Sequence, residues 1–250
     1  MDFKRVDALA EKLRSLRPLN EAELKRVRDD FIIENTYDSN AIEGSTLTLR
    51  ETALILREGI TIGEKPLKAH LEAIGHKDAF EYILMLTERD TPLTERIIKE
   101  IHSLVLMSDF RNKGVYRSIP VYIKGAAHTP PQPYLVQPQM EALIADYGAL
   151  KRERRIYEAI AEFHLRFEGI HPFIDGNGRT GRLIMNFELI KAGLLPINIK
   201  FTDRRKYYDC FDSYYGGQGT DALTGLIAGC EAAELEWFID ILKNTNNYGE

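Results

Sequence analysis

The feature that most constrains the fold is a glycine-rich segment, His171 to Arg182, which lies between two stretches with helical periodicity. Before it, apolar residues recur at the spacing of one helix face: Ile156, Ile160, Phe163, Phe167 and Ile170. After it, the same spacing predicts a helix that begins near Gly178: Leu183, Ile184, Phe187 and Ile190. The segment is therefore expected to be a loop that leads into a helix N-terminus, and the sequence predicts a mostly α-helical protein.

The same segment carries groups suited to a phosphate. Amide groups at a helix N-terminus have no intrahelical acceptor, and together with the helix dipole they favour an anion. Asp175 can hold Mg2+, which in proteins takes one or two carboxylates and substrate phosphates. Arg179 and Arg182 are three residues apart, so one helix face can direct both guanidinium groups at phosphate oxygens. His171 is the side chain of the segment that can take a proton near neutral pH.

The glycines of the segment also allow a different interpretation, a dinucleotide-binding turn. Gly176, Gly178 and Gly181 spell G-x-G-x-x-G, and Asp203 follows at about the expected separation. That fingerprint requires a preceding strand in a βαβ unit, whereas the residues before it have helical periodicity and end at Pro172. A turn with a purely structural role would not need a histidine, an aspartate and two arginines together. A phosphate site that carries out chemistry is therefore favoured over both.

The twelve residues match the motif of the Fic family, HPFx(D/E)GNGRxxR, at every specified position, and on this basis the chain resembles that family. The resemblance implies a Fic-type helical bundle with a small β-hairpin, the flap, over the active site. It places the catalytic core at residues 50–243, after an N-terminal helical region at 1–49 and before a tail at 244–250. It also implies a protein adenylyltransferase. Such an enzyme transfers AMP from ATP to a serine, threonine or tyrosine hydroxyl of a target protein, and in some cases to itself.

The resemblance assigns roles to the residues of the motif. His171 is the base that deprotonates the target hydroxyl, and Asp175 binds Mg2+, the expected cofactor. Asn177 and the loop amides hold the α- and β-phosphates, Arg179 contacts the phosphate chain, and Arg182 contacts the γ-phosphate. His171, Asn177 and Arg179 are the expected catalytic residues. The other residues of the motif that are expected in the nucleotide site are small: Gly176, Gly178, Thr180 and Gly181.

A second, shorter pattern lies near the end of the N-terminal region. Ser39 and Glu43 are four residues apart on a predicted helix, residues 21–43, which Gly44 is expected to stop. Taken alone, Glu43 is more readily explained as a solvated residue in a last helical turn. Beside the first motif, Ser39-xxx-Glu43-Gly44 fits the inhibitory pattern (S/T)xxxE(G/N) of the Fic family. Its position before the core resembles the class II arrangement, which implies that Glu43 pairs with Arg182, occupies the place of the γ-phosphate and autoinhibits the enzyme.

A strand-like stretch precedes the motif. Val121, Tyr122 and Ile123 form the most strand-like run of the chain, and the proline-rich residues 130–133 would bring the chain back before a helix at 138–151. This pattern predicts a short hairpin, with a surface loop as the alternative. In the Fic family a flap at this place binds the target's backbone by strand pairing, and the three residues would edge the nucleotide.

A tyrosine pair follows the motif. Tyr207 and Tyr208 open a helical pattern, and adjacent tyrosines are usual in core packing. The family places an aromatic from this pair beside adenine or ribose, so the resemblance adds both residues to the nucleotide site. Residues 216–219 are expected to form a flexible turn before a last helix at about 221–242.

Composition restricts the partners and the compartment. A net charge of −5 and a sequence pI near 5.8 argue against a general nucleic-acid or membrane-binding surface. No apolar stretch reaches the length of a membrane span. Cys210 and Cys230 fit no metal spacing and are expected as free thiols in a reducing compartment, and the N-terminus shows no signal-peptide pattern. We therefore expect a cytoplasmic protein that binds ATP and a target protein, with an effector secreted without a cleaved signal as the alternative. Its oligomeric state is open between a monomer and a homo-oligomer.

Three other functions stay open at this point. The first is removal of AMP from a modified protein, with Glu43 orienting the attacking water, as the resemblance allows. The second is transfer of a different group, as in phosphorylating or phosphocholine-transferring relatives, although Gly178 and Arg179 match the AMP-transferring pattern. The third is a non-enzymatic binding module, against which the intact catalytic set argues.

Overall fold

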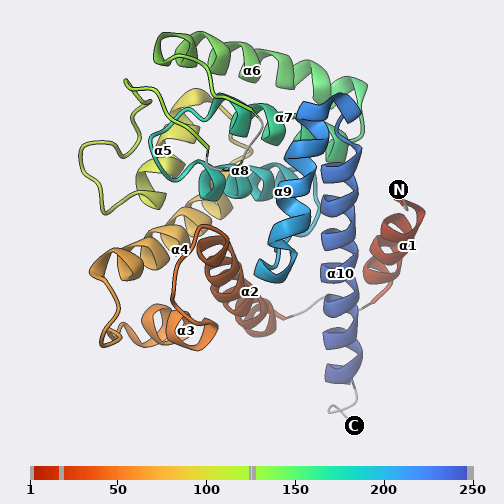
Figure 1. The fold of residues 1–250 in the computed structure, drawn as a ribbon. Coiled ribbons are helices and arrows are strands. Elements are labelled where there is room, and N and C mark those ends of the chain that lie inside the picture. The colour runs from red at the N-terminus through yellow and green to blue at the C-terminus, as the bar shows by residue number, and fades with distance from the viewer. Residues whose placement is uncertain (1–2, 17–19, 124, 126–127, 247–250) are drawn as a thin grey trace.

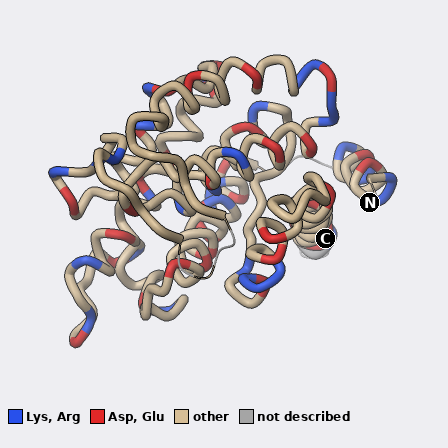
Figure 2. Tube along the Cα trace, turned by 45° about the horizontal axis from the view of Figure 1, so that its top comes forward, with Lys and Arg blue, Asp and Glu red and all other residues tan. Residues whose placement is uncertain are grey.

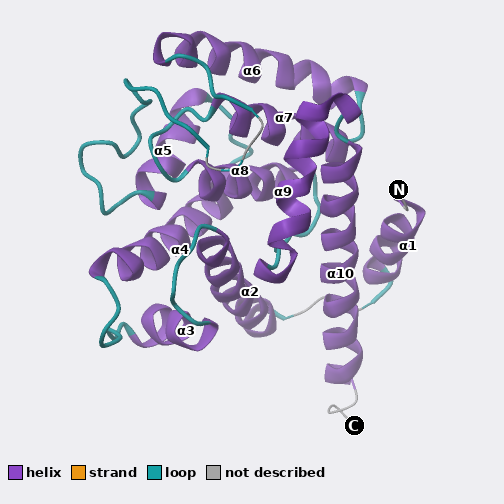
Figure 3. Cartoon of the chain, viewed as in Figure 1, coloured by secondary structure: helices purple, strands orange, loops and turns teal. Residues whose placement is uncertain are grey.

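The computed structural model describes residues 3–16, 20–123, 125 and 128–246, and the described chain is almost entirely helical (Figures 1 and 3). No strand occurs in these residues. The prediction of a mostly α-helical fold is therefore confirmed. The helices are α1 (Phe3–Arg14), α2 (Glu21–Ile42), α3 (Leu49–Glu58), α4 (Leu67–Glu88), α5 (Glu95–Val105), α6 (Pro133–Glu153), α7 (Ile156–Ile170), α8 (Asn177–Lys191), α9 (Arg204–Ser213) and α10 (Asp221–Asn246).

Helices α7 and α8 are central because each of them packs into two hydrophobic cores. One core is formed mainly with α4, α5 and α6, and the other mainly with α1, α9 and α10, which lie on the opposite side of the pair (Figure 1). On α8, Leu183 and Phe187 belong to the first core and Met185 and Leu189 to the second. A helix with apolar residues on several faces is buried. The loop between α7 and α8 is thus anchored by the best-packed part of the molecule.

Helix α2 brings the second sequence pattern to this centre. Its first half is mostly exposed, whereas its second half is buried and bound by polar contacts. Asp38 accepts hydrogen bonds from the Asn198 side chain at 2.7 Å and from the Phe201 N–H at 2.8 Å. The helix ends at Ile42, and Gly44 follows with φ +95°, as expected for a residue that stops a helix. The predicted boundary between an N-terminal region and the core at residues 49 and 50 stays a prediction.

The stretch before α6 differs most from the sequence prediction. Helix α6 begins at Pro133 rather than at residue 138, so the expected return of a hairpin is a helix start. Proline suits the first position of a helix because its missing N–H would have no intrahelical acceptor there. Residues 118–123 form neither helix nor strand, and the turn of the expected hairpin falls largely on 124 and 126–127, outside the described residues. The hairpin itself therefore stays a prediction.

A smaller difference concerns the glycines after α9. Instead of a flexible turn at 216–219, residues Tyr214–Gln218 form one wide helical turn, in which Gly217 has φ +83°. The side chain of Tyr215 anchors this turn: its hydroxyl donates to the Leu165 carbonyl at 3.0 Å and its ring stacks on His128. This contact explains why a glycine-rich segment is ordered here.

Acidic and basic residues are interspersed along the chain rather than gathered on one element (Figure 2). This distribution agrees with the modest net charge of −5.

None of the helices in the described part of the chain combines the length and the apolar character needed to cross a membrane.

Candidate active site

The loop between α7 and α8 is fixed by its own backbone and by one amide side chain. His171 ends α7 in the left-handed region, at φ +49°, and its N–H donates to the Phe167 carbonyl at 3.0 Å. Asn177 accepts from the Phe173 N–H and donates to the Phe173 carbonyl, both at 2.9 Å. Gly176 precedes α8 with φ +79°, a conformation that favours glycine. The predicted loop into a helix N-terminus is confirmed. Because the Asn177 amide is engaged in shaping the loop, its contact with a phosphate stays a prediction.

Two buried side chains from outside the motif support this loop, and the sequence did not assign either of them to the site. His102 donates through Nε2 to the Asp175 carbonyl at 2.9 Å. Arg117 donates to the His171 carbonyl at 2.8 Å and to the Pro131 carbonyl at 2.6 Å. Their partners in the loop lie 73 and 54 residues further along the chain, so no local pattern could have revealed them.

His171 has the environment of a base. Its Nδ1 is buried and has no hydrogen-bond partner within the described residues, while 22% of the side chain is exposed. The nitrogen open to a cavity of about 430 Å3 is therefore Nε2. Burial lowers the pKa of His171 to about 4, which the Glu168 carbonyl opposes and the Arg117 guanidinium reinforces. The imidazole is neutral at pH 7 and can accept a proton.

The N-terminal turn of α8 faces the same cavity through Gly178. The first N–H of this helix that is engaged within it belongs to Thr180, which donates to the Gly176 carbonyl at 3.0 Å. The amides of Asn177, Gly178 and Arg179 precede it and have no intrahelical acceptor. No acidic residue lies in this turn to compete with an anion. The amides at this helix end can thus bind a phosphate when the Glu43 carboxylate beside Gly178 moves away. The Thr180 side chain is fully buried, and its contact with a nucleotide stays a prediction.

Arg182 is held by the end of α2. Its Nε donates to Ser39 Oγ at 3.1 Å, and its Nη2 donates to the Ser39 carbonyl at 2.9 Å and to Glu43 Oε1 at 2.8 Å. A Cβ atom on Gly178 would overlap the same Glu43 oxygen, so the missing side chain makes room for the carboxylate. Burial opposes the charge on Arg182, but Glu43 and Tyr207 outweigh it and raise its pKa. The structure therefore brings together the three residues that the resemblance to the family linked: Ser39, Glu43 and Arg182.

Arg179 points to a second cavity, of about 290 Å3, which Glu43 also lines. The Arg179 guanidinium lies 3.0 Å from Glu72 Oε1 and 3.4 Å from Asp175 Oδ1. Lys68 lies 3.5 Å from Asp175 as well. The sequence missed Lys68 and Glu72 because an i,i+4 pair on a helix is typical of a solvated face. Only the packing of α4 against α8 places that face in the site.

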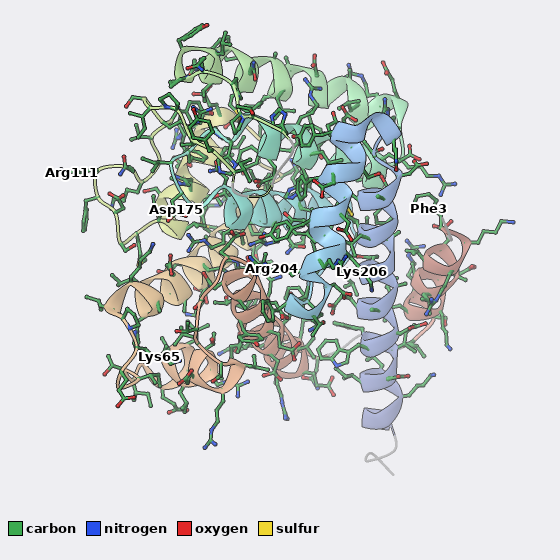
Figure 4. All side chains as sticks on the ribbon, viewed as in Figure 1. Phe3, Lys65, Arg111, Asp175, Arg204 and Lys206 are labelled. Carbon is green, nitrogen blue, oxygen red and sulfur yellow. The ribbon has the colours of Figure 1, made fainter. Side chains whose placement is uncertain are left out.

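Asp175 lies at the N-terminal end of α8 (Figure 4), and its side chain is 49% exposed. Burial opposes its ionisation, but Arg179, the Gly176 N–H and Lys68 together outweigh this and lower its pKa. The residues that the structure describes contain no group of three or more His, Cys, Asp or Glu side chains that could hold a metal ion. A cation at this place would therefore take Asp175 and substrate phosphates as ligands, an arrangement that suits Mg2+.

The wall of the larger cavity opposite the loop is aromatic. Tyr207 and Tyr208 both line it. Tyr208 is 39% exposed, whereas Tyr207 is 1% exposed and also packs in the core. Ile123 lines the cavity from the other side. Tyr122 is 85% exposed and Val121 is partly buried, and neither is among the lining residues. Of the predicted flap residues, Ile123 thus reaches the site.

Curated proteins similar in sequence carry the name that the motif suggested. The sequence model of the Fic/DOC family matches residues 92–189. Protein adenylyltransferase Fic of Nematostella vectensis is 35% identical over 210 residues, which are 82% of this chain and 48% of that protein. Protein adenylyltransferase Fic of Aedes aegypti is 36% identical over 212 residues, which are 83% of this chain and 42% of that protein. The chain therefore spans about half the length of the curated relatives that it matches.

Solved structures match over a larger share of their length. A Fic-domain-containing signaling protein from Bacteroides thetaiotaomicron superimposes with a TM-score of 0.88 at 30% identity, over 96% of this chain and 97% of that chain. Fic-1 from C. elegans superimposes with a TM-score of 0.85 at 26% identity, over 97% and 72%. With the complete motif in place on the loop before α8, and with similarity over nearly the whole of both chains in the first case, this chain belongs to the Fic/DOC family.

Proposed function

We propose that this chain is a protein adenylyltransferase, which transfers AMP from ATP to a hydroxyl group of a target protein. The observation that carries the proposal is one cavity that joins His171, the first turn of α8 and Arg182 to the aromatic pair Tyr207 and Tyr208. A base, an anion site and an aromatic wall in one space fit a nucleotide and an attacking hydroxyl. The activity named for the curated relatives supports the proposal.

In this reaction the target hydroxyl gives its proton to His171 Nε2, and its oxygen attacks the α-phosphorus of ATP. The bond between the α-phosphorus and the bridging oxygen breaks, and pyrophosphate leaves with the electron pair. His171 then releases the proton to solvent, which its lowered pKa favours. Arg179 and Arg182 are 2% and 5% exposed, so their charges are in place before charge develops on the leaving group.

Asp175 is the proposed ligand for Mg2+. Its carboxylate is ionised at neutral pH, half-exposed and close to the open end of α8. When bound, Mg2+ would neutralise part of the charge of the phosphate chain. Lys68 and Arg179 hold the carboxylate in the absence of nucleotide, and the exposed Lys68 side chain would be free to turn to the phosphates.

We also propose that the resting protein is autoinhibited in the class II arrangement. Glu43 occupies the face of Arg182 to which a γ-phosphate oxygen would bind, at 2.8 Å. A carboxylate at this place repels a phosphate by like charge. Ser39 holds Arg182 through two further contacts, so the guanidinium stays in position when Glu43 leaves.

The target protein is proposed to bind at residues 118–123. This segment forms neither helix nor strand, and Ile123 at its end borders the cavity. Arg117 fixes the start of the segment to the loop that carries His171. A backbone segment that is in neither a helix nor a sheet can pair with an extended strand of a partner, and pairing here would place a target side chain near His171.

The test of the proposed function is the position of the label in ATP. A Glu43→Gly protein incubated with candidate targets and ATP labelled on the α-phosphate should transfer the label to protein, whereas ATP labelled on the γ-phosphate should not. Transfer of the γ label would instead identify a phosphorylating enzyme. Absence of any ATP turnover by this variant would favour a binding module. Mass spectrometry of the modified protein then identifies the hydroxyl residue.

A second candidate reaction, removal of AMP, is favoured by one observation. Glu43 and His171 line the same cavity, so a water between them would have a carboxylate to orient it. Incubation with a protein that already carries AMP decides between the two. Release of AMP by the wild type, lost in Glu43→Gly, would make Glu43 a catalytic residue.

A further inference from the structure

Glu168 is a buried carboxyl group beside the base, and the mechanism above gives it no role. It lies on α7, three residues before His171, and its Oε2 is 3.8 Å from His171 Nδ1. Glu168 Oε1 and His171 Nδ1 are both buried, and neither makes a well-formed hydrogen bond in the described part of the chain, although the Glu168 carbonyl acts on the His171 ring and raises its pKa. Buried polar atoms are rarely left unpaired because desolvation without a hydrogen bond is unfavourable. The carboxyl group that carries the unpaired Oε1 thus lies beside the unpaired Nδ1, which points to an interaction that another state of the protein completes.

Gly181 makes the space for this carboxyl. A Cβ atom there would lie 2.7 Å from Glu168 Oε1 and 2.8 Å from His164 Cε1, closer than packed atoms approach. The third glycine of the motif therefore lets α8 pack directly against the Glu168 side chain. A larger residue would push the carboxyl out of its place beside His171.

We propose that Glu168 is the positioning residue for His171: its carboxylate accepts a hydrogen bond from Nδ1–H and so keeps Nε2 free for the proton of the target hydroxyl. This inference rests on the proposed function. The separation of 3.8 Å is longer than a hydrogen bond, but distances between catalytic partners are often long before the substrate binds.

The arrangement has the logic of a carboxylate behind a catalytic histidine. The proton taken from the hydroxyl goes to Nε2, and Nδ1 keeps its own proton, so no bond to hydrogen breaks at Glu168. The negative charge of the carboxylate stabilises the imidazolium that forms. The neutral form of Glu168 would fix the ring less well, and it would not stabilise the cation.

Several charged and titratable groups lie around Glu168. They are Glu43 directly after α2, His164 of α7, His171 of the loop, Arg182 of α8, Tyr207 of α9 and Tyr215 of the wide helical turn. Burial raises the pKa of Glu168 to about 8, Glu43 acts in the same direction, and Arg182 opposes both. Removal of Glu43 therefore lowers the pKa of Glu168 and increases its ionised fraction at pH 7. The effect of Glu168 should thus be measurable in a Glu43→Gly protein.

The experiment takes the full-length Glu43→Gly protein as its parent and adds two substitutions in turn. Glu168→Gln keeps the size and an acceptor but removes the charge, and Glu168→Met removes both at similar volume. The matched control is Glu158→Gln, which removes a carboxylate from the same helix away from the site. At saturating ATP we expect AMP transfer to fall about 10-fold in the Gln variant and about 100-fold in the Met variant, as for loss of a charge-assisted hydrogen bond. ATP affinity and the control should be unchanged.

The pH profile separates positioning from packing. The carboxylate form is the active one, so the rate of the parent should rise with pH through the pKa of Glu168, which burial keeps above its ordinary value. This step should be absent in Glu168→Gln. Rates within about twofold of the parent, or a step retained in the Gln variant, would overturn the inference. An equal loss of ATP affinity or of thermal stability would also overturn it, because the side chain would then act through packing.

A readout that does not need turnover keeps this inference separate from the proposed function. Nitrogen NMR of His171 with a non-hydrolysable ATP analogue bound should show an Nδ1–H resonance that shifts in both Glu168 variants and not in Glu158→Gln. An unshifted resonance would contradict the contact. If the parent binds ATP but transfers no AMP, the proposed function fails and the resonance still decides on Glu168.

Discussion

Replacement of Glu43 by glycine is the most direct test of autoinhibition. Glu43 accepts a hydrogen bond from Arg182 at 2.8 Å, and the Glu43 side chain is 35% exposed whereas that of Arg182 is 6% exposed. A hydrogen bond between charged groups contributes about 1.5–3 kcal/mol when it is protected from water, and an exposed ion pair contributes less than about 1 kcal/mol. Partial exposure of one partner places this pair near 1.5–2 kcal/mol, which is roughly 10- to 30-fold in an equilibrium. We therefore expect Glu43→Gly to raise AMP transfer by about this factor.

The assay compares four proteins at one ATP concentration below saturation: the wild type, Glu43→Gly, Ser39→Ala, and Glu43→Gly combined with Arg182→Ala. Ser39→Ala should activate less than Glu43→Gly, because it removes the contact of Oγ at 3.1 Å but leaves that of the carbonyl at 2.9 Å. The double variant should not be activated, since the γ-phosphate has then lost its partner. If Glu43→Gly is no faster than the wild type on any protein, itself included, Glu43 is an ordinary solvated residue and does not inhibit the enzyme.

Three further predictions use the same parent, Glu43→Gly. His171→Ala should lower AMP transfer by about 10²–10⁴-fold with ATP affinity nearly unchanged in a calorimetric titration; a rate within about tenfold of the parent would exclude His171 as the base. Asp175→Ala should abolish transfer together with its Mg2+ dependence, and equal rates in Mg2+ and EDTA would show that Asp175 is not the metal ligand. The neutral base is lost as pH falls through the pKa of His171, which burial lowers to about 4. With Glu168→Gln added, the rate should therefore stay constant from pH 7 to about 5, and a midpoint near 6.5 would contradict the assignment.

The part of the site that is local in sequence could be predicted from the sequence. The apolar periodicity before and after the glycine-rich segment predicts the two helices, and the unpaired amides at the start of the second helix predict the anion site. Both predictions depend only on residues within a few helical turns of one another. His171 and Arg182 are fixed relative to each other by that short stretch. The pairing of Arg182 with Glu43, 139 residues away, was predicted from the resemblance and not from any local pattern.

Contacts between distant segments could not be derived in this way. Arginine is usually exposed, so the sequence gives no reason to bury Arg117. It is nevertheless 5% exposed and donates to the loop, because α5 and the following turn bring it there. Pro133 is compatible with a loop and with a helix start, and packing of Val136 and Met140 into the core decides for the helix. In the sequence, Glu168 cannot be distinguished from the other charged residues of α7. Its place beside His171 depends on Gly181 of α8, because any side chain at that position would overlap the carboxyl group.

Helix α2 is bound to the core along its second half, whereas the Glu43 side chain at its end is partly exposed. This contrast determines how fast the ion pair between Glu43 and Arg182 can open. Opening the pair with Arg182 needs rotation of one side chain and no movement of the helix. Such rotations take picoseconds to nanoseconds at exposed positions, and an ion pair of about 2 kcal/mol slows them by roughly 30-fold. Enzymatic turnover takes on the order of a millisecond to a second. The inhibited state would therefore form and open many times during each turnover, so progress curves should start without a lag, and the resting protein should leak AMP transfer at a steady low rate.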